Sequence, residues 1–360
     1  MVPHGGRIFR LAQALGVAPD AILDFSASIN PYGPPQSVKD AIIRHVDHIR
    51  WYPDADASSL RNTIATRHGI PLESLLLTNG ASEAIDLAIG AREWRHVWVL
   101  DPAFSEYRAA AQRHRLSVSP LSLTEAFDIP WDTLKSQVEA GDLVIINNPH
   151  NPSGRAYQAI DLHAPIQALI KKDAAVLIDE AFVDFLPDPG AASLVGDRSS
   201  AHLLVIRSLT KFYAIPGLRL GYVAGDPHWI AAMREHQDGW SVNQLALEAG
   251  EASLADGAFD EMTRQWLGFA QQQVKALWPG ELPVIPTFTD VNFFLLRWGS
   301  VARAQQLAQS LRQQGILVRE ANGFRGLHPA TWRVAMLRPE DNQALYHAVS
   351  ALLHRPSEPQ

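Results

Sequence analysis

The chain has 360 residues, a formal net charge of −7 and no cysteine. This length fits one large unit with an appendage or two domains, and a hydrophobic content of 47% is enough for a real core. The acidic balance argues against a nucleic-acid partner, while the lack of cysteine excludes disulfides, zinc–thiolate sites, iron–sulfur clusters and a thiol nucleophile. No run approaches the about 20 apolar residues of a membrane-spanning helix, so we expect a cytoplasmic protein that does not bind membranes.

The N-terminal part of the chain contains several short elements. His4-Gly5-Gly6 precedes an amphipathic helix from Ile8 to Leu15, which Gly16 ends. A short apolar run, Leu23 to Phe25, follows, and a helix is expected from Ser37 to about His48. A His-Gly-Gly sequence taken alone is typical of a flexible start.

Short apolar strands alternate with helices between about residues 75 and 225. Ser58 or Ser59 is expected to cap the helix before the first strand, and Gly69 to end that helix. The alternation predicts an α/β protein with a large, doubly wound and mostly parallel sheet. The expected strands are 75–78, 97–100, 143–146, 176–178, 203–206 and 220–224.

The character of the sequence changes after the last of these strands. The chain is helical from about Pro227 to Leu277 and then contains three strands and two helices, which predict a small α+β domain. We therefore expect four parts. They are residues 1–48, which pack on the small domain and the active site, a large domain at 49–282 with a helical connector from about 235, a small domain at 283–354, and a disordered tail at 355–360.

Lys211 follows the strand at 203–206, and ligands of open α/β sheets bind where strands end. A lysine amine with a lowered pKa can form a Schiff base with a carbonyl. Ser208 and Arg219 can bind a phosphate, and a carbonyl together with a phosphate describes pyridoxal 5′-phosphate. A single Ser-x-x-Lys is more often a surface lysine beside a turn, so the interpretation depends on the rest of the chain.

Three other segments carry suitable groups. Gly80-Ala81-Ser82 opens a helix and can present backbone N–H groups to an anion, although an ordinary helix cap explains it equally well. Asp179 ends a buried strand, where an acid is costly without a partner, and a structural salt bridge is the simpler explanation. Asn147 to Gly154 forms a rigid loop without helix or strand character.

Together these motifs resemble the fold-type I pyridoxal-phosphate enzymes of the aspartate aminotransferase superfamily, in their histidinol-phosphate aminotransferase-like branch. The resemblance covers nearly the whole chain and depends on the order and spacing of the motifs. They are Gly80-Ala81-Ser82, Phe104, Asn147 to Gly154, Asp179 to Phe182, Ser208-x-x-Lys211 and Arg219. Within that branch the chain resembles the threonine-phosphate decarboxylases of cobalamin biosynthesis at His4-Gly5-Gly6, Leu23 to Pro31, Tyr52 to Asp56, Asp179 to Phe185 and Arg207 to Arg219.

The resemblance implies a role around the coenzyme ring for five residues. Lys211 would carry the coenzyme covalently, and Asp179 would pair with the pyridine nitrogen and keep it protonated. Asn151 would donate a hydrogen bond to the ring O3′, and Phe104 would stack on the ring. Phe182 stands where many relatives have a tyrosine that also reaches O3′, so one hydrogen bond is expected to be missing.

The resemblance also implies the groups that bind the coenzyme phosphate. These are the backbone of Gly80 and Ala81, the side chains of Ser82, Ser208 and Arg219, and Tyr52 from a second subunit. A homodimer with shared active sites is therefore expected.

A phosphorylated amino acid substrate requires two further anion sites. Arg333 matches the small-domain arginine that binds the substrate carboxylate in the family. Arg319 and His4 with Gly5 and Gly6 are candidates for the substrate phosphate. Asn30 is a further candidate for substrate binding, and no metal site is expected.

The resemblance implies decarboxylation of L-threonine O-3-phosphate to (R)-1-amino-2-propanol O-2-phosphate. The residues alone support only a pyridoxal-phosphate enzyme, because decarboxylation and transamination differ by a rotation about one bond that no motif records. The alternative is an aminotransferase acting on histidinol phosphate or a related phosphorylated amine. A non-catalytic regulator that binds the coenzyme is disfavoured by the acidic chain and by the start of the coenzyme-binding domain almost at residue 1.

Overall fold

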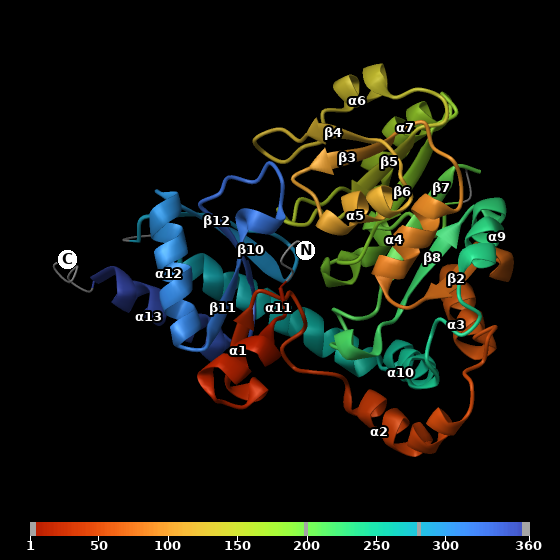
Figure 1. Ribbon diagram of the computed structural model, residues 1–360. Coiled ribbons are helices and arrows are strands. Elements are labelled where there is room, and N and C mark those ends of the chain that lie inside the picture. The colour runs from red at the N-terminus through yellow and green to blue at the C-terminus, as the bar shows by residue number, and fades with distance from the viewer. Residues whose placement is uncertain (1–4, 198–200, 279–281, 355–360) are drawn as a thin grey trace.

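The computed structural model describes residues 5–197, 201–278 and 282–354. Two β-sheets with helices packed on them form the molecule (Figure 1). The larger sheet has seven strands in the order β2-β8-β7-β6-β5-β3-β4, and the smaller has five in the order β1-β11-β12-β10-β9.

The large sheet confirms the predicted mostly parallel α/β architecture. Its strands are β2 (Leu75–Thr78), β3 (Val97–Asp101), β4 (Val118–Ser122), β5 (Leu143–Asn147), β6 (Ala175–Asp179), β7 (Leu203–Ser208) and β8 (Gly221–Gly225). The five strands β3 to β7 pair in parallel, whereas β8 is antiparallel to both of its neighbours. Strand β4 was not predicted, because it is a partly exposed edge strand and contains Pro120, which only an edge tolerates.

Helices cover both faces of this sheet, which explains why its central strands are apolar except at their carboxyl ends. Leu177 of β6 packs in a cluster with α4 (Ala81–Gly90), α5 (Ser105–Arg113) and α9 (Pro227–His236). Its neighbours Val176 and Ile178 belong to the other cluster. That cluster extends into the small sheet and includes, among other helices, α3 (Ser58–His68), α6 (Trp131–Gln137), α7 (Ala159–Ile170) and α10 (Gln244–Ala255), with the short α8 (Pro189–Ala192).

The start of α3 differs from the prediction. Ala57 precedes the helix with a positive φ of 47°, and neither Ser58 nor Ser59 caps it. Instead the carboxylate of Asp54 accepts a hydrogen bond from the Ser58 N–H at 2.8 Å, because Ser58 is already the first helical residue. Gly69 ends the helix in the left-handed conformation, as predicted.

The small sheet combines one strand from the N-terminal part of the chain with four strands from residues 284–335 (Figure 1). It consists of β1 (Leu23–Phe25), β9 (Val284–Thr287), β10 (Phe293–Trp298), β11 (Ile316–Glu320) and β12 (Thr331–Ala335), with α1 (Ile8–Leu15), α11 (Gly257–Leu277), α12 (Val301–Gln313) and α13 (Pro339–His354) nearby. Strand β1 pairs in parallel with β11, so that Phe25 lies opposite Val318. The segment after β1 is thereby placed beside Arg319, at the junction with the large sheet.

No helix in the described ranges is long and apolar enough to cross a membrane. Helix α2 (Gln36–His45) lies at the lower end of the molecule in Figure 1 and packs on α10. A short 3-10 turn, Val46–Arg50, follows α2, which therefore ends earlier than the predicted His48.

Candidate active site

The ends of β5, β6 and β7 and the start of α4 face the small sheet across a cavity of about 310 Å³. Most of the residues that the sequence singled out lie on this cavity, although they come from distant parts of the chain. Those on its wall are Gly5, Ala81, Ser82, Phe104, Asn151, Asp179, Phe182, Ser208, Lys211, Arg219, Arg319 and Arg333. His4 lies outside the described residues.

Lys211 lies in this cavity, directly after β7. Its Nζ donates to the hydroxyl of Ser208 at 3.2 Å and lies 5.2 Å from the ring centre of Phe182. Burial lowers the pKa of Lys211 to about 8; Asp179 opposes this effect, and the charges of Arg219 and Arg333 add to it. A larger fraction of the amine is therefore neutral near neutral pH, which is the form that attacks a carbonyl.

Asp179 is buried at the end of β6, and its carboxylate accepts two hydrogen bonds. The Oη of Tyr107 donates to Oδ2 at 2.6 Å, and the backbone N–H of Ala181 donates to Oδ1 at 2.9 Å. Burial raises the pKa of Asp179, and the bond from Tyr107 and the charge of Lys211 oppose that rise. Tyr107 was not among the predicted site residues, although its position three residues after Phe104 places both on one face of the chain entering α5.

Tyr107 is therefore a positioning residue for Asp179, and Tyr107→Phe tests this role. Losing the donor should raise the pKa of Asp179 and move the acid limb of the kcat/KM profile to higher pH. We also expect kcat to fall by about tenfold, as for one hydrogen bond to a charged group. The pH dependence of both parameters is the measurement. Tyr157→Phe, which removes a hydroxyl bound to Asp128 outside the cavity, is the control. An unshifted acid limb would contradict the role.

Arg333 of β12 is buried and has an unsatisfied donor. Its Nη1 donates to the Asn151 Oδ1 at 2.6 Å and its Nη2 to the Ser26 carbonyl at 3.0 Å, while no described residue accepts from its Nε. Burial lowers the pKa of Arg333 to about 9, and the charge of Arg319 adds to this effect. A buried N–H without a partner is costly, and a bound anion would satisfy it.

Arg319 lies directly opposite Arg333 on β11, so the small sheet presents two guanidinium groups to one cavity. The Arg319 side chain lies 5.2 Å from the ring centre of Phe324. Burial lowers its pKa to about 10, and Arg7 adds to the effect. Gly5 approaches the backbone of Ser26 so closely that a Cβ would collide with its carbonyl, and the N–H of Gly6 donates to the Ser26 hydroxyl at 2.9 Å.

The start of α4 forms a cradle of a size and charge that suit a phosphate. Gly80 has a φ of +78°, and a Cβ at this position would collide with the guanidinium of Arg219. Ala81 and Ser82 follow in the first helical turn, whose N–H groups have no partner within the helix. The hydroxyl of Ser208 lies 2.8 Å from that of Thr210, a cavity residue that the sequence analysis did not single out.

Four predicted site residues in the described ranges do not line this cavity: Gly6 and Gly80, which adjoin it, and Asn30 and Tyr52, which have other contacts. The amide of Asn30 donates to the Phe212 carbonyl at 3.0 Å and to the Thr263 hydroxyl at 2.8 Å, and the Asn30 N–H donates to the Lys211 carbonyl at 3.0 Å. Asn30 therefore supports the loop that carries the lysine, which differs from the predicted contact with substrate. Tyr52 is exposed and stacks on Trp240 with ring centres 4.4 Å apart.

Ser28 is a cavity residue that the sequence analysis did not single out. It is buried, its Oγ has no hydrogen-bond partner among the described residues, and it lies between the cavity residues Ala27 and Ile29. The Ser-Ala-Ser segment offered no periodicity that distinguishes one of its hydroxyls from the other.

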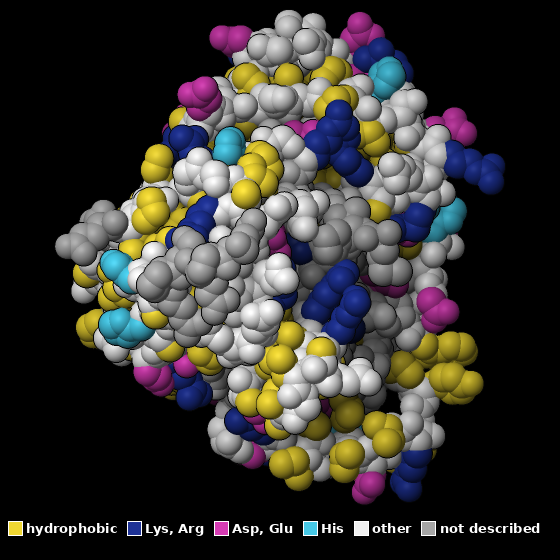
Figure 2. Space-filling model, turned by 60° about the vertical axis from the view of Figure 1, so that its left-hand side comes forward, with side chains coloured by type: hydrophobic (Ala, Val, Ile, Leu, Met, Phe, Trp, Pro, Cys, Tyr) yellow, Lys and Arg dark blue, Asp and Glu magenta, His cyan; other side chains and the backbone are white. Residues whose placement is uncertain are grey.

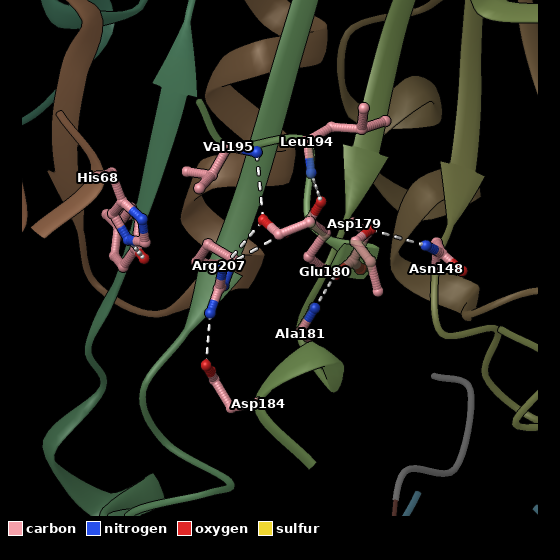
Figure 3. A network of polar contacts seen from close by, with 12 residues as sticks. His68, Asn148, Asp179, Glu180, Ala181, Asp184, Leu194, Val195 and Arg207 are labelled. Carbon is pink, nitrogen blue, oxygen red and sulfur yellow. Dashed lines mark hydrogen bonds and ion pairs between the residues drawn. The ribbon is translucent and has the colours of Figure 1, made fainter. Parts of the chain in front are cut away.

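A second polar network lies behind Asp179 and joins β6 to β7 (Figure 3). The buried carboxylate of Glu180 accepts from the Ser193 hydroxyl at 2.5 Å and the Leu194 N–H at 2.7 Å, and forms an ion pair with Arg207 at 3.4 Å. Arg207 also bonds Asp184 at 2.5 Å. Burial raises the pKa of Glu180 to about 7, although Arg207, Ser193 and the Leu194 N–H oppose this rise. The network ties together the strand ends that carry Asp179 and Lys211.

Comparisons with known proteins agree with this geometry. The family model described as aminotransferase class I and II matches residues 20–349. The chain belongs to the aminotransferase class I and II family. A threonine-phosphate decarboxylase of Salmonella typhimurium is 36% identical over 97% of this chain and 96% of its own length.

Two solved structures of the family are similar over most of their length. The histidinol-phosphate aminotransferase of Clostridium acetobutylicum matches with a TM-score of 0.85 and 28% identity, over 92% of this chain and 99% of that one. The L-threonine-O-3-phosphate decarboxylase of Porphyromonas gingivalis matches with a TM-score of 0.80 and 25% identity, over 93% of this chain and 100% of that one.

Pyridoxal 5′-phosphate is the coenzyme of this family, and the chain is an enzyme that depends on it. The cavity fits the coenzyme: a lysine with a lowered pKa, a buried carboxylate and a glycine cradle beside an arginine lie on one wall. The described residues contain no cluster of acidic and histidine side chains suited to a metal ion.

Proposed function

We propose that the chain decarboxylates L-threonine O-3-phosphate to (R)-1-amino-2-propanol O-2-phosphate in cobalamin biosynthesis. The observation that carries the proposal is the pair of buried guanidinium groups of Arg319 and Arg333, which face one cavity beside Lys211. A substrate with a carboxylate at one end and a phosphate at the other needs two such groups. The names of the relatives from Salmonella typhimurium and Porphyromonas gingivalis support the choice of reaction.

The residues divide the work as follows. When bound, pyridoxal 5′-phosphate would act as an electron sink for the bond cleaved at the substrate Cα. Asp179 holds the proton of the pyridine nitrogen, and Arg219 with the start of α4 holds the coenzyme phosphate. Arg333 binds the substrate carboxylate through its Nε and the adjacent nitrogen, which fixes the bond to be broken.

Lys211 has two tasks in this proposal. Its neutral amine would hold the coenzyme covalently until the substrate amine replaces it. The freed amine would then return a proton to the substrate Cα once carbon dioxide has left, and its pKa of about 8 suits proton transfer near neutral pH.

Transamination of histidinol phosphate or a related phosphorylated amine is the second candidate. The similarity to the histidinol-phosphate aminotransferase of Clostridium acetobutylicum favours it. The two functions are separated by a paired assay, in which labelled carbon dioxide is collected from threonine phosphate and 2-oxoglutarate-dependent amino transfer from histidinol phosphate is measured. Amino transfer without release of carbon dioxide would overturn the proposed decarboxylase.

The phosphate of the substrate should decide its recognition. Unphosphorylated L-threonine loses the contacts to Arg319, and each hydrogen bond to a charged group contributes about 1.5–3 kcal/mol. We therefore expect its kcat/KM to be about 10³-fold lower than that of L-threonine O-3-phosphate. Arg319→Gln should reduce the ratio of the two kcat/KM values, because it should lower kcat/KM for the phosphorylated substrate only. An equal loss for both substrates would contradict the assignment of Arg319.

We also propose that the protein is a cytoplasmic homodimer in which Tyr52 reaches the coenzyme phosphate of the partner subunit. Exposed apolar side chains gather on α2 and the turn that follows it, including Ile43, Ile49 and Trp51. Figure 2 shows hydrophobic side chains at this lower end of the molecule. An apolar patch of this kind is typical of a surface that another protein covers. Sedimentation of the wild type and of Tyr52→Phe tests the assembly separately from coenzyme binding.

A further inference from the structure

A second cavity, of about 450 Å³, lies beside the active-site cavity and has a strongly basic lining. Four arginines contribute to it: Arg7, Arg10, Arg312 and Arg319. The acid on its wall is Glu320, which pairs with Arg312 at 2.6 Å. The lining therefore carries a net positive charge, and a cavity of this kind concentrates anions.

The arrangement of the basic side chains follows from the first helix. Arg7, Arg10, Leu11 and Ala14 line the cavity and are spaced so that they form one stripe of α1. The opposite contacts of α1 are apolar, since Ala12 packs with Ile22 and Leu317. Helix α1 is therefore held against the small sheet while its basic stripe faces the cavity.

Backbone contacts fix the start of that stripe. The N–H of Gly6 donates to the Ser26 hydroxyl at 2.9 Å, and the Arg7 carbonyl accepts from the N–H of Leu11 at 3.2 Å. Within the described ranges, neither Arg7 nor Arg10 forms an ion pair with a carboxylate. The charge of Arg7 also contributes to the lowered pKa of Arg319, so the two guanidinium groups repel each other. A bound anion would relieve that repulsion.

The two cavities are continuous in their linings. Gly5, Ser26 and Arg319 belong to both. Arg319 thus stands between the inner cavity, which holds Lys211 and Arg333, and the outer cavity, which holds Arg7 and Arg10. An anion that moves from the outer cavity to the inner one remains next to a guanidinium group throughout.

We infer that the cavity lined by Arg7, Arg10, Arg312 and Arg319 is an outer binding site for a phosphomonoester dianion, which captures the phosphorylated substrate before it enters the active site. This inference rests on the proposed function for the identity of the substrate. The outer site should raise the association rate of the substrate, because its positive charge attracts the anion. Added salt should weaken this effect, because it screens the attraction. The outer site does not touch the reacting bond, so kcat should be unaffected.

The test uses the holoenzyme with Arg7→Gln and Arg10→Gln combined. A matched control combines Arg297→Gln and Arg303→Gln, which make the same change in net charge but line neither cavity. For the outer-site variant we expect kcat/KM for L-threonine O-3-phosphate to fall about tenfold at low salt and its dependence on salt to flatten, with kcat unchanged. The control should behave as the wild type. Equal kcat/KM values and equal salt slopes in the two variants would overturn the inference.

A binding measurement keeps the inference separate from the proposed reaction. Inorganic phosphate is titrated into each holoenzyme by calorimetry while the visible spectrum of the coenzyme is monitored. Binding about tenfold weaker in the outer-site variant than in the control, with an unchanged spectrum, would support the outer site even if no carbon dioxide is released. Binding as tight as in the control would overturn it. Inorganic phosphate should inhibit the wild type competitively; a change in kcat caused by phosphate would point to a separate effector and would also overturn the capture role.

Discussion

Lys211→Ala should abolish covalent attachment of the coenzyme and lower turnover by about 10⁴-fold or more. Lys211 places its amine on the wall of the cavity, and burial lowers the pKa of this amine to about 8. Alanine can neither bind the coenzyme carbonyl nor carry a proton to the substrate Cα. The phosphate cradle at the start of α4 is left intact, so noncovalent binding of the coenzyme should persist.

Borohydride reduction followed by peptide mapping gives the direct measurement. In the wild type the coenzyme should be fixed on Lys211, and in the variant no labelled peptide should appear. Lys171→Ala, which removes an exposed lysine at the end of α7, serves as the control and should be labelled and active as the wild type. Labelling of a different lysine in the wild type would refute the central assignment of the site.

Asp179→Asn should lower kcat by about 10²- to 10⁴-fold while the coenzyme still binds. Removing one partner of a buried charge pair costs about 3–5 kcal/mol, and each 1.36 kcal/mol corresponds to a factor of ten in rate. Asparagine fits the same space and can keep the contacts to Tyr107 and Ala181. It carries no charge, so it holds the pyridine proton less well and the coenzyme becomes a weaker acceptor of electrons.

The measurement is single-turnover kinetics together with a titration of the coenzyme into the apoenzyme. Asp173→Asn is a suitable control, because Asp173 is an exposed carboxylate in the turn before the same strand, β6. The control should match the wild type in both experiments. A near-normal kcat for Asp179→Asn would remove Asp179 from the mechanism, whereas complete loss of coenzyme binding would assign it a role in binding alone.

The sequence predicted the architecture of the large sheet because its strands are buried on both faces. Short, continuous apolar runs such as Leu203 to Ile206 are typical of strands in a parallel sheet that helices cover on both faces. Strand β4 escaped prediction because an edge strand need not be apolar. The predicted cap of α3 was wrong because the Ser58 N–H donates to the carboxylate of Asp54, several residues before the helix, and not to a serine hydroxyl next to it.

The sequence also predicted most of the proposed site residues that line the cavity, because the motifs at strand ends are local in the chain. A lysine three residues beyond a buried strand, or an aspartate at the end of one, lies at the edge of the sheet where ligands bind. The glycine cradle at Gly80 is likewise a property of one short segment, since only a residue without a Cβ can adopt its positive φ beside Arg219.

Only the tertiary structure decided which groups from distant segments meet. The pairing of β11 with β12 places Arg319 opposite Arg333, and the folding of α5 against β6 brings Tyr107 to Asp179. Asn30 lies in a segment rich in polar residues, yet its amide donates to the Phe212 carbonyl after Lys211 and to the Thr263 hydroxyl of α11, and no sequence pattern could show that. The stripe of Arg7 and Arg10 became a binding surface only because β1 and α1 pack on the small sheet. Strand ends and glycine turns are specified by neighbouring residues, whereas contacts between side chains depend on the register and packing of elements that are far apart in the chain.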